Sequence, residues 1–230
     1  MSNRRIFVKQ AAAISLLYPL RNIAIGGGNK LNKNIGEREI LAEPGPMIPP
    51  VPAILLSVNG QNDSPDQISV VWTFVVNGKP PQIGISVEDP HVVLDLIKKK
   101  REFVLNVPTS DMIESFDKID MNSSRLGDKF ALSGFTAERA QSIDAPAIAE
   151  SPIHVECNVI QELRVPPIRT VFIAEVTATT VLPGVCDEKG RLIVEDVDFF
   201  GMTAGSGEFY TMGDKIGHIG KTVGRDDIKY

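Results

Sequence analysis

The hydrophobic positions after residue 52 fall into short runs rich in Val, Ile and Phe, and turn residues separate these runs. Runs of this length and composition, bounded by Gly, Pro, Asn and Asp, are typical of β-strands. Asn59-Gly60 and Asn77-Gly78 are turn signals, so the first three strands are predicted to form an antiparallel meander. At least six strands are predicted, over residues 53–58, 68–76, 82–87, 102–107, 154–163 and 170–182.

Helical segments are few and short. The best defined covers residues 92–100, because Asp89 can cap it, Pro90 fits its first position and the lysines at its end favour the negative end of the helix dipole. Many strands that do not alternate with helices predict a mainly β fold, a barrel or sandwich with a few short peripheral helices. A doubly wound dehydrogenase fold is disfavoured.

The N-terminus has the pattern of a targeting segment. Arg4-Arg5, with Phe7 and Lys9 at the right offsets, precedes an apolar run over residues 11–20, and this resembles a twin-arginine signal. An ordinary amphipathic helix is the alternative. The run is too short to span a bilayer, so no stable membrane span is predicted. Residues 1–25 are therefore expected to direct export, for example to the periplasm, with a cytoplasmic location as the alternative.

A linker is predicted over residues 26–45. The three glycines at 26–28 lack the spacing of a nucleotide-binding loop, and a flexible linker explains them. The prolines that begin at Pro44 mark the entry into a folded domain over residues 46–230.

Composition narrows the function classes. With 43% hydrophobic residues in 230, the chain can bury one sizeable core. A net charge of −5 and no basic cluster beyond residues 98–101 exclude nucleic acid as a partner. Cys157 and Cys186 lack a C-x-x-C spacing and are expected to be buried free thiols. No metal-ligand spacing is present, so no metal site is predicted.

Several collinear segments resemble one family. Four of them correspond to the first four predicted strands, and a fifth, the stretch from Ser124 to Phe130 followed by residues 133–136, is the most specific. Together they resemble the flavin reductase-like and flavoredoxin family. That resemblance implies an FMN-binding split β-barrel that forms a homodimer, with FMN at the subunit interface.

The resemblance also implies a phosphate site. An FMN phosphate needs charged donors, hydroxyls or backbone N–H groups, and Arg125 and Lys129, four residues apart, could both reach it from one helical turn beside Ser124. The alternative is an exposed pair flanking Asp128.

The flavin ring needs backbone groups around its pyrimidine edge and an apolar wall over one face. Family members place the ring along the second and third strands, where the matching residues are Ser69, Val70, Trp72, Ser86 and Val87. Trp72 could instead fill the core. Asn106, a polar residue in an apolar strand, is a further candidate for the flavin site because a buried amide must find partners.

The sequence departs from the family at one strand end. Relatives often carry a basic residue after the third strand and a hydroxyl residue a few positions later, where this chain has Glu88, Asp89 and Val93. Asp66 replaces a frequent Asn. Acidic groups repel a phosphate, so either Arg125 and Lys129 bind it or the affinity for FMN is lost.

Three functions fit these patterns. The first is an FMN reductase that takes hydride from NADH or NADPH, in which the cofactor performs the redox step and no catalytic side chain can be named. The second is an exported FMN electron carrier that serves a redox partner protein, and the third is a flavin-free binding barrel. His91 is expected at the surface, and His154 either near the flavin or in a structural role.

Overall fold

The computed structural model describes residues 40–61, 65–122 and 127–225. The contacts divide the chain into Met1–Pro44 and Gly45–Tyr230, and all elements described below belong to the second unit. Its strands are β1 Val51–Pro52, β2 Ile54–Val58, β3 Gln67–Gly78, β4 Pro81–Glu88, β5 Glu102–Val107, β6 Ala137–Arg139, β7 Pro146–Ile148, β8 Ile153–Val165, β9 Arg169–Val181, β10 Phe200–Met202 and β11 Phe209–Thr211. Its α-helices are α2 Val92–Lys100, α3 Ile113–Met121 and α4 Lys129–Ser133, and its 3₁₀ helices are Ser110–Met112, Val194–Asp196 and Lys221–Val223.

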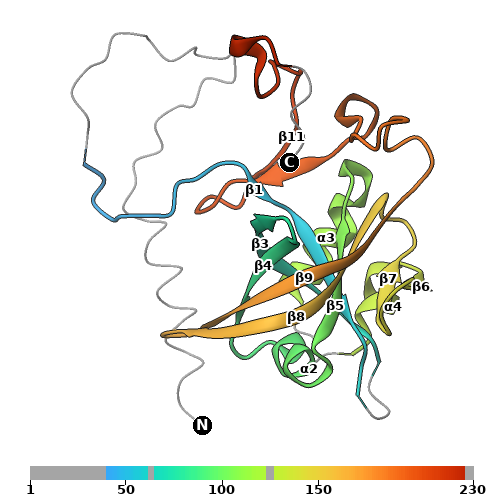
Figure 1. The fold of residues 1–230 in the computed structure, drawn as a ribbon. Helices are drawn as coiled ribbons and strands as arrows, with labels where there is room; N and C mark the ends of the chain where they lie inside the picture. Colours follow the sequence, from blue (N-terminus) through green and yellow to red (C-terminus); the bar gives the residue numbers. More distant parts are fainter. Residues whose placement is uncertain (1–39, 62–64, 123–126, 226–230) are drawn as a thin grey trace. The chain divides into compact units, whose positions relative to one another are not determined.

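A closed antiparallel barrel dominates the fold, with strand order β2-β3-β4-β9-β8-β5 (Figure 1). The predicted meander β2-β3-β4 is confirmed, and the six predicted strands are the six barrel strands. The β8–β9 hairpin is the longest pairing. β8 extends beyond both of its predicted ends, whereas β9 begins and ends one residue earlier than predicted. A separate small sheet joins β1, β10 and β11.

Strand β2 is buried on both faces, and its alternate residues serve two cores. Leu56 points into the barrel, where Phe103 and Phe172 are also fully buried. Leu55 faces the opposite way, into a second cluster that α3 and the small sheet complete. There Phe116, Phe200 and Phe209 stack edge to face, with ring centroids 5.5 to 5.7 Å apart. These rings hold the C-terminal sheet against the barrel.

Helix α2 lies at its predicted position, but its start differs from the prediction. His91 is the N-cap residue, no side chain caps the helix, and Asp89 and Pro90 lie before it. Asp89 instead forms an ion pair with Arg164. At the other end Lys98 and Arg101 both pair with Glu162. The Asp89 side chain therefore pairs with the end of β8 and does not cap the helix.

Strands β3 and β4 separate at one end of the barrel, and this fork creates the candidate site. Their ladder stops at the Trp72–Ser86 pair. Before Trp72, β3 pairs only with β2, and after Ser86, β4 pairs only with β9. Inside the fork, the backbone N–H and C=O groups on the facing edges of β3 and β4 therefore form no ladder hydrogen bonds with each other.

Candidate functional site

The fork holds a cleft of about 100 Å³. All five residues predicted to contact the flavin ring line it, and they are Ser69, Val70, Trp72, Ser86 and Val87. The other lining residues are Glu88, His91, Asp120, Arg169 and Met202. Trp72 is 43% exposed, so it forms a wall of the cleft and does not fill the core.

Arg169 is the main residue of the cleft that was not predicted from the sequence. It is the register partner of Glu88 across β4 and β9, and its Nη2 lies 2.8 Å from Glu88 Oε2. The guanidinium carbon lies 4.0 Å from the centroid of the Trp72 ring, in a cation–π contact. Nη1 also donates to the backbone carbonyl of Ser86 at 3.4 Å.

The contact with Arg169 changes how Glu88, an acidic residue where relatives often carry a basic one, affects an anionic ligand. Glu88 does line the cleft, but its charge is balanced by Arg169 rather than left to repel a bound anion. A cation is therefore present at this strand end, although β9 supplies it instead of β4. Sequence reasoning could not find it, because 81 residues separate Glu88 from Arg169.

Asp120 brings a carboxyl group to the cleft from the last turn of α3. Burial raises the pKa of this carboxyl above its usual range, and the neighbouring charge of Asp117 adds to the shift. Lys129 and His91 act in the opposite direction on the same pKa. Asp120 therefore adds a carboxyl group to the cleft lining beside that of Glu88.

Lys129, predicted to bind the phosphate, does not line the cleft. Its side chain is buried, and its ammonium group donates to the backbone carbonyls of Ile119 and Asn122 at the C-terminal end of α3. These carbonyls have no partner within the helix, so the ammonium group satisfies acceptors that burial would otherwise leave unpaired. Ser124 and Arg125, the other two residues of this prediction, lie outside the described residues.

Asn106 is also committed elsewhere in the fold. Its amide nitrogen donates to the Leu55 carbonyl at 3.0 Å and to the Ser57 hydroxyl at 2.9 Å, and its amide oxygen accepts from the Ile148 backbone N–H at 2.8 Å. The buried amide therefore ties β2 and β5 to β7. It does not line the cleft.

His154 has a structural environment of the same kind. Nε2 lies 2.8 Å from the Ile148 carbonyl, and Nδ1 faces the Thr180 hydroxyl and the Glu138 carboxylate. Of the two cysteines, Cys157 is buried as predicted, whereas Cys186 is partly exposed; both are free. Among the described residues, no group of His, Cys, Asp and Glu is arranged to hold a metal ion.

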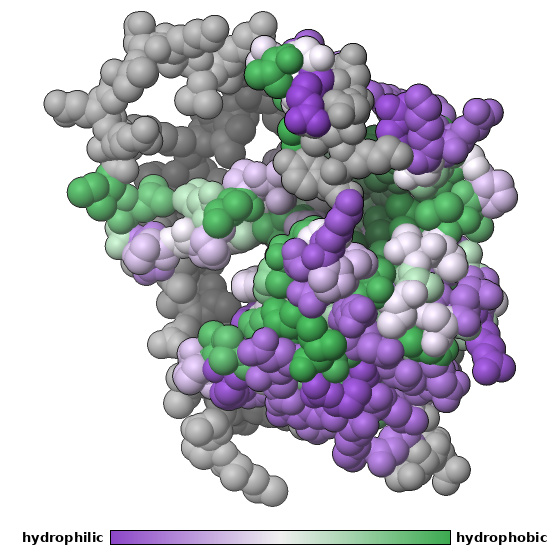
Figure 2. Space-filling model, in the orientation of Figure 1, coloured by the Kyte–Doolittle hydropathy of each residue, from purple (hydrophilic) through white to green (hydrophobic). Residues whose placement is uncertain are grey.

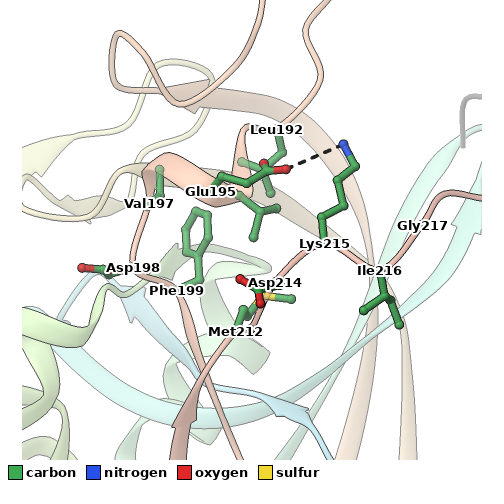
Figure 3. Close-up of a pocket in the computed structure, with 12 residues that line it drawn as sticks. Leu192, Glu195, Val197, Asp198, Phe199, Met212, Asp214, Lys215, Ile216 and Gly217 are labelled. Carbon is green, nitrogen blue, oxygen red and sulfur yellow. Dashed lines mark ion pairs between the residues drawn. The ribbon is translucent and has the colours of Figure 1, made fainter.

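A larger cavity of about 580 Å³ lies between residues 192–199 and 212–217, with Phe199 at its centre (Figure 3). Glu195 and Lys215 pair across it at 3.7 Å. Its lining also carries Asp198 and Asp214, so carboxylates outnumber ammonium groups three to one. Such a lining disfavours a phosphate dianion, and the smaller cleft at the fork is the better candidate for an anionic cofactor.

Comparison with known proteins agrees with the fold. The closed six-stranded barrel with a few short helices makes this chain a split-barrel protein, a fold that it shares with the similar structures. Residues 49–193, more than half of the chain, match the family described as "Flavin reductase like domain". The chain therefore belongs to the flavin reductase-like family.

The similar proteins are distant in sequence. An uncharacterised protein of Archaeoglobus fulgidus is 24% identical over 118 residues, which cover 51% of this chain and 66% of that protein. The flavoredoxin of Desulfovibrio vulgaris has a TM-score of 0.73 at 23% identity and covers 80% of this chain and 97% of its own. The flavoredoxin of Methanosarcina acetivorans has a TM-score of 0.71 at 24% identity, with coverages of 81% and 100%. The FMN-binding protein of Thermus thermophilus has a TM-score of 0.62 at 17% identity, with coverages of 81% and 99%. At these identities the structures show the shared fold.

Proposed function

We propose that the cleft at the β3–β4 fork binds FMN and that the protein is an FMN-dependent oxidoreductase. The observation that carries the proposal is the convergence of five predicted ring-contact residues with one arginine in a single cleft. Membership of the flavin reductase-like family and the fold shared with an FMN-binding protein support it.

The residues present fit the chemistry of FMN. The fork offers strand-edge backbone groups and two hydroxyls, those of Ser69 and Ser86, for the polar edge of the ring. Trp72 and Met202 offer apolar surface, and Arg169 offers a permanent positive charge. When bound, FMN supplies the redox chemistry, while the protein binds, orients and desolvates it.

The cleft of one chain is too small to enclose this cofactor. Pockets for small molecules usually measure about 300–1,000 Å³, several times the 100 Å³ of the cleft. Beyond Trp72 the barrel surface stays apolar, and Figure 2 shows apolar atoms exposed over the β8–β9 hairpin. The exposed apolar residues of β3, β8 and the β8–β9 turn are Phe74, Val75, Val76, Ile160, Leu163, Val165 and Ile168. We propose that a second copy of the chain covers this face in a homodimer and completes the flavin site.

A charge placed on this face tests the homodimer. The side chain of Val75 is 79% exposed, so V75D leaves the barrel core intact. The variant is expected to shift the sedimentation profile toward the monomer and to lower FMN affinity. V223D is the matched control, since Val223 is 70% exposed and lies in the C-terminal segment. A wild type that sediments as a monomer contradicts the dimer, and a dimeric V75D variant contradicts this apolar region as the interface.

The activity we propose is an NAD(P)H-dependent reduction of FMN. The test is the visible spectrum of the purified protein, followed by addition of NADH or NADPH without oxygen. A yellow protein that bleaches with either nucleotide supports the reductase. A yellow protein that bleaches only with dithionite supports the second candidate, an electron carrier that serves a partner protein. A colourless protein that binds no added FMN contradicts both.

The second candidate rests on the twin arginines, which lie outside the described residues. We propose that they direct export, where free NAD(P)H is scarce. Among the described residues, no helix has the length and hydrophobicity to cross a membrane. An R4K/R5K variant, expressed in a bacterium with twin-arginine transport, is expected to stay in the cytoplasmic fraction while the wild type reaches the periplasm. Equal distribution of the two contradicts export.

A further inference from the structure

Arg169 is the only permanently charged cation among the described residues that line the cleft. The cleft also holds the carboxyl groups of Glu88 and Asp120. We propose that Arg169 is the anion-binding residue of the flavin site and that Glu88 is its positioning residue. This inference rests on the proposed FMN site. It assigns anion binding to an arginine of β9, whereas the sequence pattern predicted Arg125 and Lys129 for that role.

The donors of Arg169 are only partly used by the protein. A guanidinium group has five N–H donors in a fixed planar fork. Among the described residues, Arg169 donates two hydrogen bonds: Nη2 donates to the Glu88 carboxylate, and Nη1 donates to the Ser86 carbonyl at a long 3.4 Å. Stacking on Trp72 engages the face of the guanidinium group and leaves its edge available. The remaining donors therefore have no acceptor in the part of the chain described and can take an oxyanion.

The pair with Glu88 contributes little to the fold itself. The Arg169 and Glu88 side chains are 25% and 39% exposed, and ion pairs near solvent usually add no more than about 1 kcal/mol. Strands β4 and β9 are already joined by a continuous ladder from Gln82–Glu175 to Glu88–Arg169. What the pair does achieve is orientation, because it fixes the long Arg169 side chain over Trp72 at the fork.

FMN offers two anionic groups that such a residue can bind. One is the phosphate, a dianion near neutral pH. The other is the ring itself, which carries negative charge when reduced. Either the phosphate or the reduced ring can accept hydrogen bonds from a guanidinium group, and two measurements distinguish them. Riboflavin lacks the phosphate, and the midpoint potential reports the charge on the ring.

The experiment compares full-length wild type with R169Q, R169K and E88Q. R191Q is the charge-matched control, because Arg191 pairs with Asp187 and neither residue lines the cleft. Fluorescence titrations give the affinity for FMN and for riboflavin, and potentiometry gives the midpoint potential of each complex. Thermal shift with inorganic phosphate gives anion binding by the flavin-free protein.

If Arg169 binds the phosphate, R169Q weakens FMN binding about tenfold to a hundredfold, leaves riboflavin affinity unchanged, and abolishes stabilisation by inorganic phosphate. If it faces the ring, R169Q lowers the midpoint potential with FMN and riboflavin alike. R169K keeps the charge without the fork geometry and is expected to recover only part of either effect. E88Q is expected to show the same effect as R169Q at smaller size, because the arginine loses its anchor.

The two proposals fail in different ways. A wild type that binds neither flavin contradicts the FMN site, and the phosphate-dependent stabilisation then still tests Arg169. Arg169 is overturned as the anion-binding residue if R169Q matches R191Q in flavin affinity, midpoint potential and phosphate stabilisation. Glu88 is overturned as the positioning residue if E88Q equals the wild type while R169Q does not.

Discussion

Phe74 and Gly84 face each other in the β3–β4 ladder, and the Phe74 ring occupies the space that a side chain at position 84 would need. A Cβ at residue 84 would lie 2.3 Å from the Phe74 ring. The G84A substitution therefore displaces the ring from β4; because the ring is 45% exposed and can turn toward solvent, the expected cost is about 0.5–1 kcal/mol, at the low end for overpacking. Urea unfolding measures this cost.

A double-mutant cycle identifies the cause of the G84A effect. In an F74A background the ring is absent, so G84A is expected to leave the unfolding free energy almost unchanged. Because Phe74 belongs to the exposed apolar face, G84A in the natural background is also expected to weaken dimerisation. Equal costs of G84A in the two backgrounds contradict this account.

Lys129 is expected to be essential to the α3–α4 pair. The K129M substitution leaves the carbonyls of Ile119 and Asn122 without their charged donor. An unsatisfied buried acceptor costs about 1–3 kcal/mol. Chemical unfolding is expected to show this loss, whereas K118M, on an exposed position of the same helix, is expected to be nearly neutral. If the two variants are equally stable, Lys129 has no structural role and a role in ligand binding regains support.

A substitution at Asn106 is expected to lower the stability of the protein without changing its affinity for FMN. The N106L substitution removes the acceptor of the Ile148 N–H and the amide donor to the Leu55 carbonyl and the Ser57 hydroxyl, which is expected to cost about 1–3 kcal/mol of stability. Because Asn106 does not line the cleft, the affinity of the folded variant for FMN is expected to equal that of the wild type. Titration below the melting temperature checks this, and a large loss of affinity returns Asn106 to the flavin site.

Glu156 is expected to make stability depend on acid pH. Burial alone raises the pKa of this carboxyl, but hydrogen bonds from the Ser142 side chain and the backbone N–H groups of Gln141 and Ser142 outweigh burial and lower it. A carboxyl whose folded pKa is depressed stabilises the protein above its unfolded pKa, about 4.3. This contribution is lost as pH falls through the folded value.

The E156Q variant tests that pH dependence. At neutral pH it is expected to be less stable than the wild type by about 1–3 kcal/mol. The difference is expected to shrink as pH drops below 4.3, because the wild-type carboxyl then becomes protonated too. Urea unfolding at a series of pH values measures it. A constant difference at all pH values shows that the charge of Glu156 contributes nothing.

The two cysteines are expected to react differently. Burial and the charge of Glu156 raise the pKa of the Cys157 thiol to about 12, whereas Cys186 is partly exposed. A thiol reagent at neutral pH is therefore expected to modify Cys186 alone in the folded protein and both thiols after denaturation. C186S is the control and is expected to abolish the fast reaction. Fast labelling of C186S contradicts the burial of Cys157.

The strands, and the strand residues that line the cleft, could be predicted because they depend largely on local signals. The Asn77-Gly78 signal predicted the β3–β4 hairpin, but the turn lies two residues later, at Lys79-Pro80, and Asn77 and Gly78 end β3. A one-residue register shift between Val75 and Asn77 then sets Trp72 opposite Ser86, and the sequence does not show that shift. The fork that turns these residues into a cleft depends on where a ladder ends, and no local pattern encodes that.

The charges of the site could not be predicted for the same reason. Arg169 reaches Glu88 through the β4–β9 register, far along the chain. Lys129 has the sequence appearance of an exposed helix residue, and only the packing of α4 against α3 buries its ammonium group. Local sequence therefore identified the strands of the cleft, but it gave no sign of the arginine that lines the cleft or of the contacts that bury Lys129.

The fork also has a consequence for how the cofactor enters. Where β3 and β4 separate, β3 stays paired with β2 and β4 stays paired with β9, so the fork needs no bound cofactor to hold its strands in place. Cofactor binding is then expected to cost little chain entropy, unlike binding that folds a disordered segment. If FMN binds at the fork as proposed, it is expected to leave and return without unfolding the barrel. The proposed site is therefore suited to flavin as a passing substrate as well as to flavin as a resident group.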